Sequence, residues 1–134
     1  MSGVDWSQLR DEALAVAQRA YAPYSHLRVG AAALTESGRI VAGCNVENAS
    51  YPVGTCAEAG LIAGLHAGGY DRLVAVATWS PDVPGAPLMP CGACRQILFE
   101  AGGADLQVAV RDGHLRLADL LPEAFGPDDL PPSS

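Results

Sequence analysis

The chain contains no lysine, few aromatic residues and no long apolar run. Its eight basic side chains are all arginines, spread from Arg10 to Arg116, whereas Asp and Glu together number 15, so the formal net charge is −7. Proteins that bind nucleic acid usually present a basic face to the phosphates, and this chain has no basic cluster. The composition therefore argues against a nucleic-acid partner and favours a small substrate that is uncharged or weakly charged.

Apolar residues make up nearly half of the chain (49%), yet no stretch approaches the roughly 20 apolar residues that a bilayer-spanning helix needs. The N-terminal residues also lack the basic start and the apolar core of a signal peptide. We therefore expect a cytoplasmic protein with no membrane partner. The length suits a single domain over residues 1–134 that can bury a core. The Pro- and Asp-rich tail, from about 127 to 134, is expected to be loose.

The order of apolar and turn-forming residues predicts a chain of alternating helices and strands. Helices are predicted over residues 5–20, 56–67 and 91–101, strands over 27–34, 39–44, 73–79, 106–110 and 114–117, and a last helical turn over 118–121. The turn residues at 35–38 join the first two strands as a hairpin, and the proline-rich residues 80–90 form a loop. Strands that alternate with helices indicate a mixed sheet with helices on its faces.

The four cysteines are the best indication of chemistry. In a cytoplasmic chain disulfides are disfavoured, so a metal or catalytic role gains weight. Cys56, Cys91 and Cys94 each stand at or near the start of a predicted helix, where free N–H groups and a partial positive charge favour a thiolate. Three thiolates bind Zn²⁺ and leave one tetrahedral position for water. Glu58, two residues from a ligand, is placed to move protons for that activated water.

Two alternatives remain open for these residues. A closed, structural zinc site would use Cys44 as a fourth ligand, although Cys44 ends an apolar strand pattern and is expected to be a buried structural thiol. Glu58 also stands three residues after Thr55, which matches a capping box in which the carboxylate would bind the backbone. Beside three candidate ligands we favour the catalytic role for Glu58.

Two motifs match the zinc deaminase signature, which is H-x-E followed by P-C-x-x-C, with Cys allowed in place of His. Here they read Cys-Ala-Glu at 56–58 and Pro-Cys-Gly-Ala-Cys at 90–94. From about Tyr21 to Leu130 the chain resembles the small homotetrameric cytidine deaminases of nucleoside salvage. Further motifs that carry the resemblance are Ala-Pro-Tyr-Ser at 22–25, Val-Gly-Ala-Ala at 29–32, Gly-Cys-Asn-Val-Glu-Asn-Ala-Ser-Tyr at 43–51 and Leu-Leu-Pro-x-x-Phe at 120–125.

This resemblance implies a fold, a cofactor and a reaction. The fold would be of the α/β class, a three-layer α/β/α sandwich around a central mixed five-stranded sheet. The cofactor would be Zn²⁺, with Cys56, Cys91 and Cys94 as ligands and Glu58 as the proton shuttle. The reaction would be hydrolytic deamination of cytidine and 2′-deoxycytidine to uridine and 2′-deoxyuridine with release of ammonia, by a homotetramer. Which of the two nucleosides is preferred is not implied.

The resemblance also assigns substrate contacts. Asn45 and Glu47 match the pair that binds the ribose hydroxyls, with ordinary loop capping as the alternative. The backbone of Ala57 would contact the pyrimidine, and Tyr51 would border the pocket. Phe125 matches an aromatic residue that reaches the base bound by a neighbouring subunit, with a role in the chain's own core as the alternative.

Two positions depart from the family pattern. Many relatives have Arg after the catalytic Glu, where this chain has Ala59. Because zinc with three thiolates carries a net negative charge, that Arg would help acidify water, and our hypothesis is that Arg95, with the helix dipoles, compensates for its loss. A solvated surface position for Arg95 is the alternative. Leu27 stands where relatives usually have a Phe that packs on the pyrimidine. It is expected to contact the base by dispersion, without the ring-on-ring geometry that is worth about 0.5–1.5 kcal/mol.

Three other functions are alternatives to the nucleoside deaminase. A related deaminase for another aminopyrimidine, such as the blasticidin type, is disfavoured by the match over residues 45–51. A non-enzymatic zinc module would need a fourth protein ligand. Editing of bases within RNA or DNA is disfavoured by the acidic balance.

Overall fold

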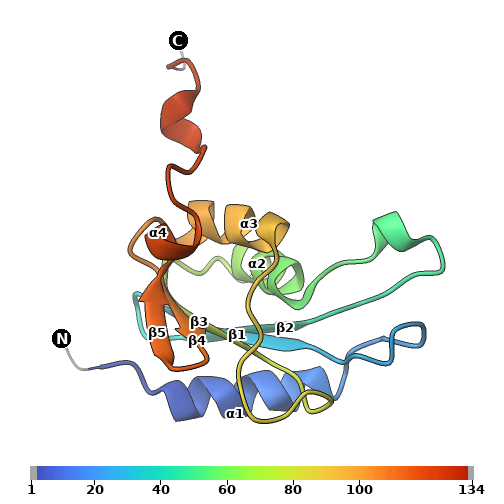
Figure 1. Ribbon diagram of the computed structural model, residues 1–134. Helices are drawn as coiled ribbons and strands as arrows, with labels where there is room; N and C mark the ends of the chain where they lie inside the picture. The colour runs from blue at the N-terminus through green and yellow to red at the C-terminus, as the bar shows by residue number, and fades with distance from the viewer. Residues whose placement is uncertain (1–2, 133–134) are drawn as a thin grey trace.

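A mixed sheet of five strands lies between two layers of helices in the computed structural model, which describes residues 3–132 (Figure 1). The main elements are α1 (Trp6–Ala17), β1 (Gly30–Thr35), β2 (Ile40–Cys44), α2 (Ala57–Ala67), β3 (Leu73–Trp79), α3 (Gly92–Gly102), β4 (Gln107–Val110), β5 (Gly113–Arg116) and α4 (Leu117–Leu120), with short 3₁₀ helices η1 (Tyr51–Val53) and η2 (Pro127–Asp129). The strand order is β2-β1-β3-β4-β5. Among these strands, β3 and β4 pair in parallel and the other neighbours pair antiparallel, so the sheet is mixed. With helices on both of its faces, the predicted three-layer α/β/α fold is confirmed.

The two faces of the sheet carry separate hydrophobic clusters because successive side chains of a strand point to opposite sides. Ala32 on β1 packs with Leu9 and Ala13 of α1. Its neighbours in the strand, Ala31 and Ala33, pack on the other face in a cluster that holds the apolar side chains of α2 and α3. One helix thus covers one face, and α2 and α3 cover the other, side by side.

Glycines bring both helical layers close to the sheet at two points. A Cβ on Gly30 would collide with the backbone of α1 at Ala13, and a Cβ on Gly43 would lie 2.7 Å from the carbonyl oxygen of Ala57 at the start of α2. Neither glycine could carry a side chain without movement of the backbone. The helix that begins after Cys56 therefore rests directly on β2.

The first strand starts later than the sequence predicts, at Gly30 rather than at residue 27. The N–H groups of residues 27–29 bind side chains instead of a neighbouring strand: Leu27 donates to Ser25, Arg28 to Asp82, and Val29 to Asn45. The hairpin of β1 and β2 is confirmed, with Ala32 opposite Ala42.

The C-terminal segment extends away from the sandwich beyond α4 (Figure 1). It contains η2, where Asp129 accepts a hydrogen bond of 2.8 Å from the N–H of Gly126. The expectation of a loose tail concerns in part residues 133–134, which lie outside the described residues. None of the helices within residues 3–132 is long and apolar enough to cross a membrane.

Candidate active site

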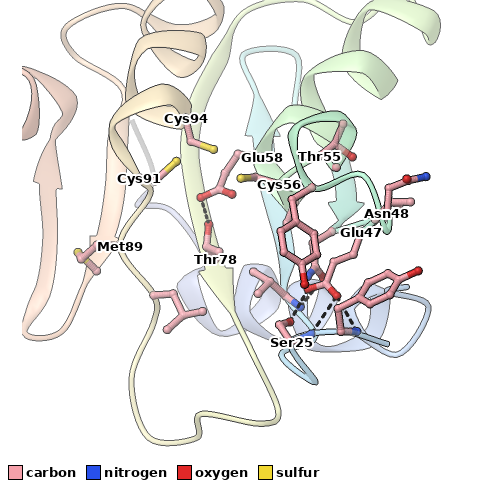
Figure 2. A pocket seen from close by; sticks show the side chains of 18 residues that line it. Ser25, Glu47, Asn48, Thr55, Cys56, Glu58, Thr78, Met89, Cys91 and Cys94 are labelled. Atoms are coloured by element: carbon pink, nitrogen blue, oxygen red, sulfur yellow. Dashed lines mark hydrogen bonds between the residues drawn. The ribbon is translucent and has the colours of Figure 1, made fainter. Parts of the chain in front are cut away.

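A cavity of about 570 Å³ opens where the N-termini of α2 and α3 meet the loop that follows β2. Its wall includes all three candidate zinc ligands, Glu58 and Glu47 (Figure 2). The loop residues Asn45 and Tyr51 also line it. Two segments more than thirty residues apart in the sequence thus contribute to one hollow. Such a concave site with converging polar groups is where a small ligand is expected to bind.

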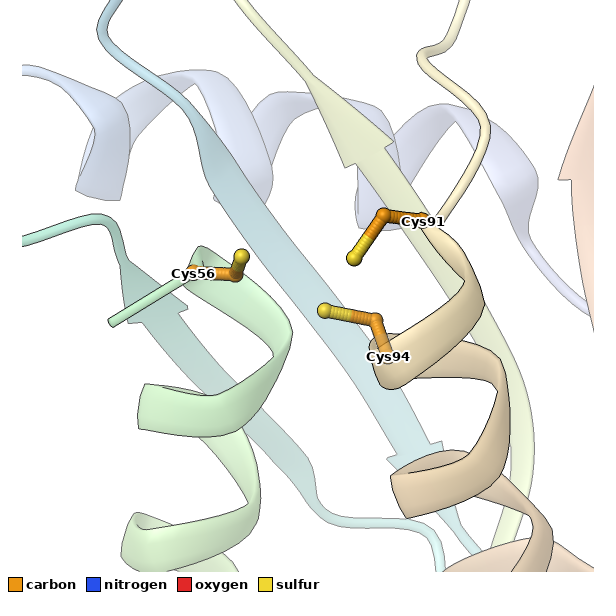
Figure 3. Close-up of side chains that lie close together, drawn as sticks. All are labelled: Cys56, Cys91 and Cys94. Atoms are coloured by element: carbon orange, nitrogen blue, oxygen red, sulfur yellow. The ribbon is translucent and has the colours of Figure 1, made fainter. Parts of the chain in front are cut away.

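Three cysteines of the cavity wall point their sulfur atoms toward one another (Figure 3). Cys56 precedes the first residue of α2, Cys91 precedes the first residue of α3, and Cys94 lies in the first turn of α3. All three sulfurs lie within 4.8 Å of one another. Three sulfurs on one tetrahedral zinc are about 3.8 Å apart, given a Zn–S length of about 2.3 Å. The donor set and its spacing therefore fit zinc.

The position of Cys44 excludes the closed four-cysteine site. Cys44 pairs with Gly30 in the sheet and does not belong to the group formed by Cys56, Cys91 and Cys94. Within residues 3–132, no other His, Cys, Asp or Glu joins that group as a fourth ligand. Three protein ligands leave one tetrahedral position for water or substrate, as in catalytic rather than structural zinc sites.

The surroundings of the three thiols shift their pKa values, and a cation between them would stabilise the thiolate forms. Burial raises the pKa of Cys94 far above its usual range, with the nearby charge of Glu58 as the second cause. Burial also raises the pKa of Cys56, whereas N–H groups at the start of α3, that of Cys94 foremost, lower the pKa of Cys91. Three adjacent thiolates repel one another, so a divalent cation is needed to hold all of them deprotonated.

Glu58 is buried beside the sulfurs, with 4% of its surface exposed. Its carboxylate does not cap α2, because Cys56 rather than Thr55 occupies the N-cap position and no side chain caps that helix. Instead, Oε2 of Glu58 accepts a hydrogen bond of 3.2 Å from the hydroxyl of Thr78 on β3 (Figure 2). The capping-box alternative therefore does not describe this structure.

Asn45 and Glu47 line the cavity and hold the segment 24–29 in place. The side-chain amide of Asn45 donates to the carbonyl of Leu27 (2.9 Å) and accepts from the N–H of Val29 (2.8 Å). Oε1 of Glu47 accepts from the N–H groups of Tyr24 and Ser25, both at 3.1 Å. Oε2 of Glu47 accepts from the hydroxyl of Ser25, which is the main reason that the pKa of Glu47 is below its usual value. Asn45 and Glu47 thus bind the backbone of the loop, as the capping alternative expects. Their contact with the ribose hydroxyls stays a prediction.

The remaining predicted substrate contacts fall in different places. Ala57 and Tyr51 line the cavity, and Tyr51 is largely exposed at 75%. Leu27 does not line it, whereas Val29, two residues on, does. Phe125 lies outside the cavity wall and is 60% exposed, so it is not a core aromatic of this chain.

Arg95 braces the loop that leads into α3. Its Nε donates to the carbonyl of Pro90 (2.8 Å), and its Nη1 donates to the carbonyl of Leu120 (2.9 Å). The side chain is half-buried, unlike a solvated surface arginine, and no sulfur of residues 3–132 accepts a hydrogen bond from it. Arg95 thus acts on the peptide before Cys91 rather than on the sulfurs themselves.

We expect Arg95→Ala to weaken zinc binding by about tenfold, the lower end of what loss of a group supporting a metal ligand costs. The loop at Pro90 would lose its tie to Leu120, so Cys91 would be held less firmly. Competition with a chromophoric chelator measures the affinity, and Arg116→Ala, an exposed arginine, is the matched control. Unchanged zinc affinity and turnover in Arg95→Ala would show that this brace is dispensable.

Sequence reasoning missed Thr78, Val29 and the pair formed by Arg28 and Asp82. Arg28 binds both carboxylate oxygens of Asp82, at 3.1 and 2.8 Å, which ties the segment before β1 to the loop before Cys91 and keeps the pKa of Asp82 at about 2. No local pattern announces that pair, because its members are 54 residues apart. The available signal for Thr78 was a single hydroxyl in the otherwise apolar strand.

Comparison with known proteins gives one consistent family. The model described as "Cytidine and deoxycytidylate deaminase zinc-binding region" matches residues 5–110. The chain is 52% identical over 131 residues to a cytidine deaminase of Mycobacterium tuberculosis, covering 98% of this chain and 97% of that protein. The crystal structure of a mutant of the M. tuberculosis enzyme superposes with a TM-score of 0.91 at 50% identity, covering 96% of this chain and 100% of the other. The crystal structure of cytidine deaminase from Mycobacterium leprae superposes with a TM-score of 0.86 at 45% identity, covering 90% of this chain and 100% of the other.

Proposed function

Since the chain belongs to the family of zinc-binding cytidine and deoxycytidylate deaminases, we infer that it converts cytidine and 2′-deoxycytidine to uridine and 2′-deoxyuridine with release of ammonia. The observation that carries this inference is the triangle of three sulfurs beside the buried carboxylate of Glu58. Both stand at the wall of a cavity large enough for a nucleoside. The reaction adds water to C4 of the base and breaks the bond from C4 to the amino nitrogen.

The residues of this chain divide the work of that reaction. Cys56, Cys91 and Cys94 would hold zinc, which when bound supplies a Lewis acid that lowers the pKa of water. Glu58 accepts a proton from the attacking water and passes it to N3 of the base. The same carboxylate then carries the second proton to the amino group, which leaves as ammonia, so one group serves first as base and then as acid. Its burial excludes bulk water from these transfers.

The charges of the cavity favour a nucleoside over a nucleotide. Two carboxylates, Glu47 and Glu58, line it, and its lining residues include no Arg, Lys or His. A phosphate group would meet no cationic side chain in this wall and would be repelled by the two carboxylates. Neutral cytidine suits the site better than deoxycytidylate, and nothing observed favours another aminopyrimidine.

The assembly is also part of this proposal. Phe125, Leu130 and Tyr51 are large apolar side chains with more than half of their surface exposed. Such surface is often covered by a partner, and the proposed arrangement is a homotetramer in which Phe125 reaches the base bound by a neighbour. The free cysteines of the described residues suit the reducing cytoplasm.

An ultraviolet assay on purified protein tests the activity. We expect deamination of cytidine and 2′-deoxycytidine, with much slower reaction of deoxycytidine 5′-monophosphate and blasticidin S. Removal of zinc by a chelator should abolish turnover, and added zinc should restore it. Absence of ammonia release from every nucleoside would overturn the proposal, and faster reaction of the monophosphate would shift it to the nucleotide.

We expect Phe125→Ala to raise KM for cytidine about five- to tenfold, because the lost ring contact is worth about 1 kcal/mol or slightly more. Steady-state kinetics measure this change, and light scattering after size exclusion reports the oligomer. Val83→Ala, which shortens an exposed apolar side chain outside the cavity wall, is the control. A fully active monomer would contradict both the tetramer and the role of Phe125.

A further inference from the structure

Thr78 places a hydroxyl group in the most apolar strand of the sheet. The strand β3 reads Leu-Val-Ala-Val-Ala-Thr-Trp, and Thr78 is buried, with 5% of its surface exposed. A buried hydroxyl without a partner costs about 1–3 kcal/mol, so an apolar residue would be favoured here unless the hydroxyl has a use.

The hydroxyl of Thr78 donates to Oε2 of Glu58 at 3.2 Å, and both side chains line the cavity (Figure 2). Within residues 3–132, no other group hydrogen-bonds the carboxylate of Glu58. The second oxygen, Oε1, is therefore free of protein partners. One oxygen of Glu58 is fixed, and the other remains available to water and substrate.

We propose that Thr78 is a positioning residue that orients the carboxylate of Glu58 for proton transfer. This inference rests on the proposed function and adds to it a residue outside the zinc deaminase motifs. Glu58 has several rotatable side-chain bonds, and a carboxylate without a bond to the protein would sample more than one direction. Holding a catalytic group in one geometry contributes directly to the rate.

The backbone of Thr78 is well suited to this task because it is held from two sides. Thr78 pairs with Ala31 of β1, and its carbonyl accepts a hydrogen bond of 2.8 Å from the N–H of Leu88. A β-branched side chain on a strand also has restricted χ1. The donor thus belongs to a rigid element, whereas Glu58 belongs to the first turn of a helix.

The primary test compares Thr78→Val with Thr78→Ser. Valine keeps the branched shape without the donor, and kcat should fall about ten- to a hundredfold with little change in KM or zinc content. Serine restores the donor and should return kcat to within about threefold of wild type. Thr35→Val removes another buried threonine hydroxyl, which accepts from the N–H of Arg39 far from the cavity. That variant should lose Tm while keeping kcat.

A double-mutant cycle with Glu58→Gln separates positioning from a general structural effect. If Thr78 acts through Glu58, Thr78→Val in the Glu58→Gln background should lower the residual rate by less than about twofold. Equal effects in both backgrounds would overturn the proposal, as would a kcat in Thr78→Val within twofold of wild type. The failure of the proposed function is distinct, because wild-type protein itself would then not deaminate cytidine. An expression strain without its own cytidine deaminase keeps low rates interpretable.

Discussion

Glu58→Gln should lose nearly all turnover while retaining its zinc. Glutamine has almost the same shape as glutamate but cannot take up and release a proton at neutral pH, and general acid–base catalysis contributes about 10²–10⁴-fold to a rate. Because Glu58 is assigned two proton transfers, we expect kcat to fall by at least about a thousandfold. Steady-state kinetics with cytidine measure the loss, and metal analysis of the same sample measures zinc.

Glu100→Gln is the matched control for this experiment, because Glu100 is an exposed glutamate on α3. It should leave both kcat and zinc unchanged. If Glu58→Gln turned over at a near-normal rate, Glu58 would not be the proton shuttle. If it lost zinc together with activity, the carboxylate would serve the metal site, and the division between three ligands and one shuttle would be wrong.

Cys94→Ser should abolish both zinc binding and activity. Cys94 is 2% exposed and supplies the most buried of the three sulfurs, and a serine hydroxyl is a poor zinc ligand in comparison with a thiolate. We expect the zinc content to fall from about one per chain to near zero. Because metal bound to the folded state alone contributes to stability, Tm should also fall.

Cys44→Ser distinguishes the triad from a closed site. Cys44 stands at the end of β2 outside the sulfur triangle, so this variant should keep its full zinc content and its activity. Zinc loss in Cys44→Ser would reopen the four-cysteine alternative. Full zinc content in Cys94→Ser would mean that the metal binds elsewhere.

The metal triad and the layers of the fold were predictable because their signals are local. Cys91 and Cys94 are one helical turn apart, and each cysteine segment opens a helix after a loop, so the spacing in the chain carries the geometry. Alternating apolar strands and amphipathic helices likewise predict a layered sheet. The layers of the fold need no knowledge of which distant residues meet. Cys56, by contrast, lies on a different helix from Cys91 and Cys94, and its pairing with them was predicted because both segments match the zinc deaminase signature.

Other features depend on contacts between distant segments, and the sequence did not reveal them. Residues 27–29 read as strand, but the side chains of Ser25, Asp82 and Asn45 accept from their N–H groups, and β1 starts at Gly30 instead. Leu27 is also absent from the cavity wall, whereas Val29 lines it. The partner of Glu58 was hidden because Thr78 is 20 residues away on a strand whose register is set by tertiary pairing.

The contact between Gly43 and α2 affects how inherited or engineered variants of this protein should be interpreted. The helix that carries Cys56 at its start sits against the bare backbone of Gly43, while Cys91 and Cys94 belong to a different helix. Any side chain at residue 43 would lift one corner of the triangle relative to the other two. A variant that has lost its metal therefore need not have an altered ligand. A screen that considers only the three cysteines and Glu58 would misclassify a substitution of Gly43 as a simple folding defect.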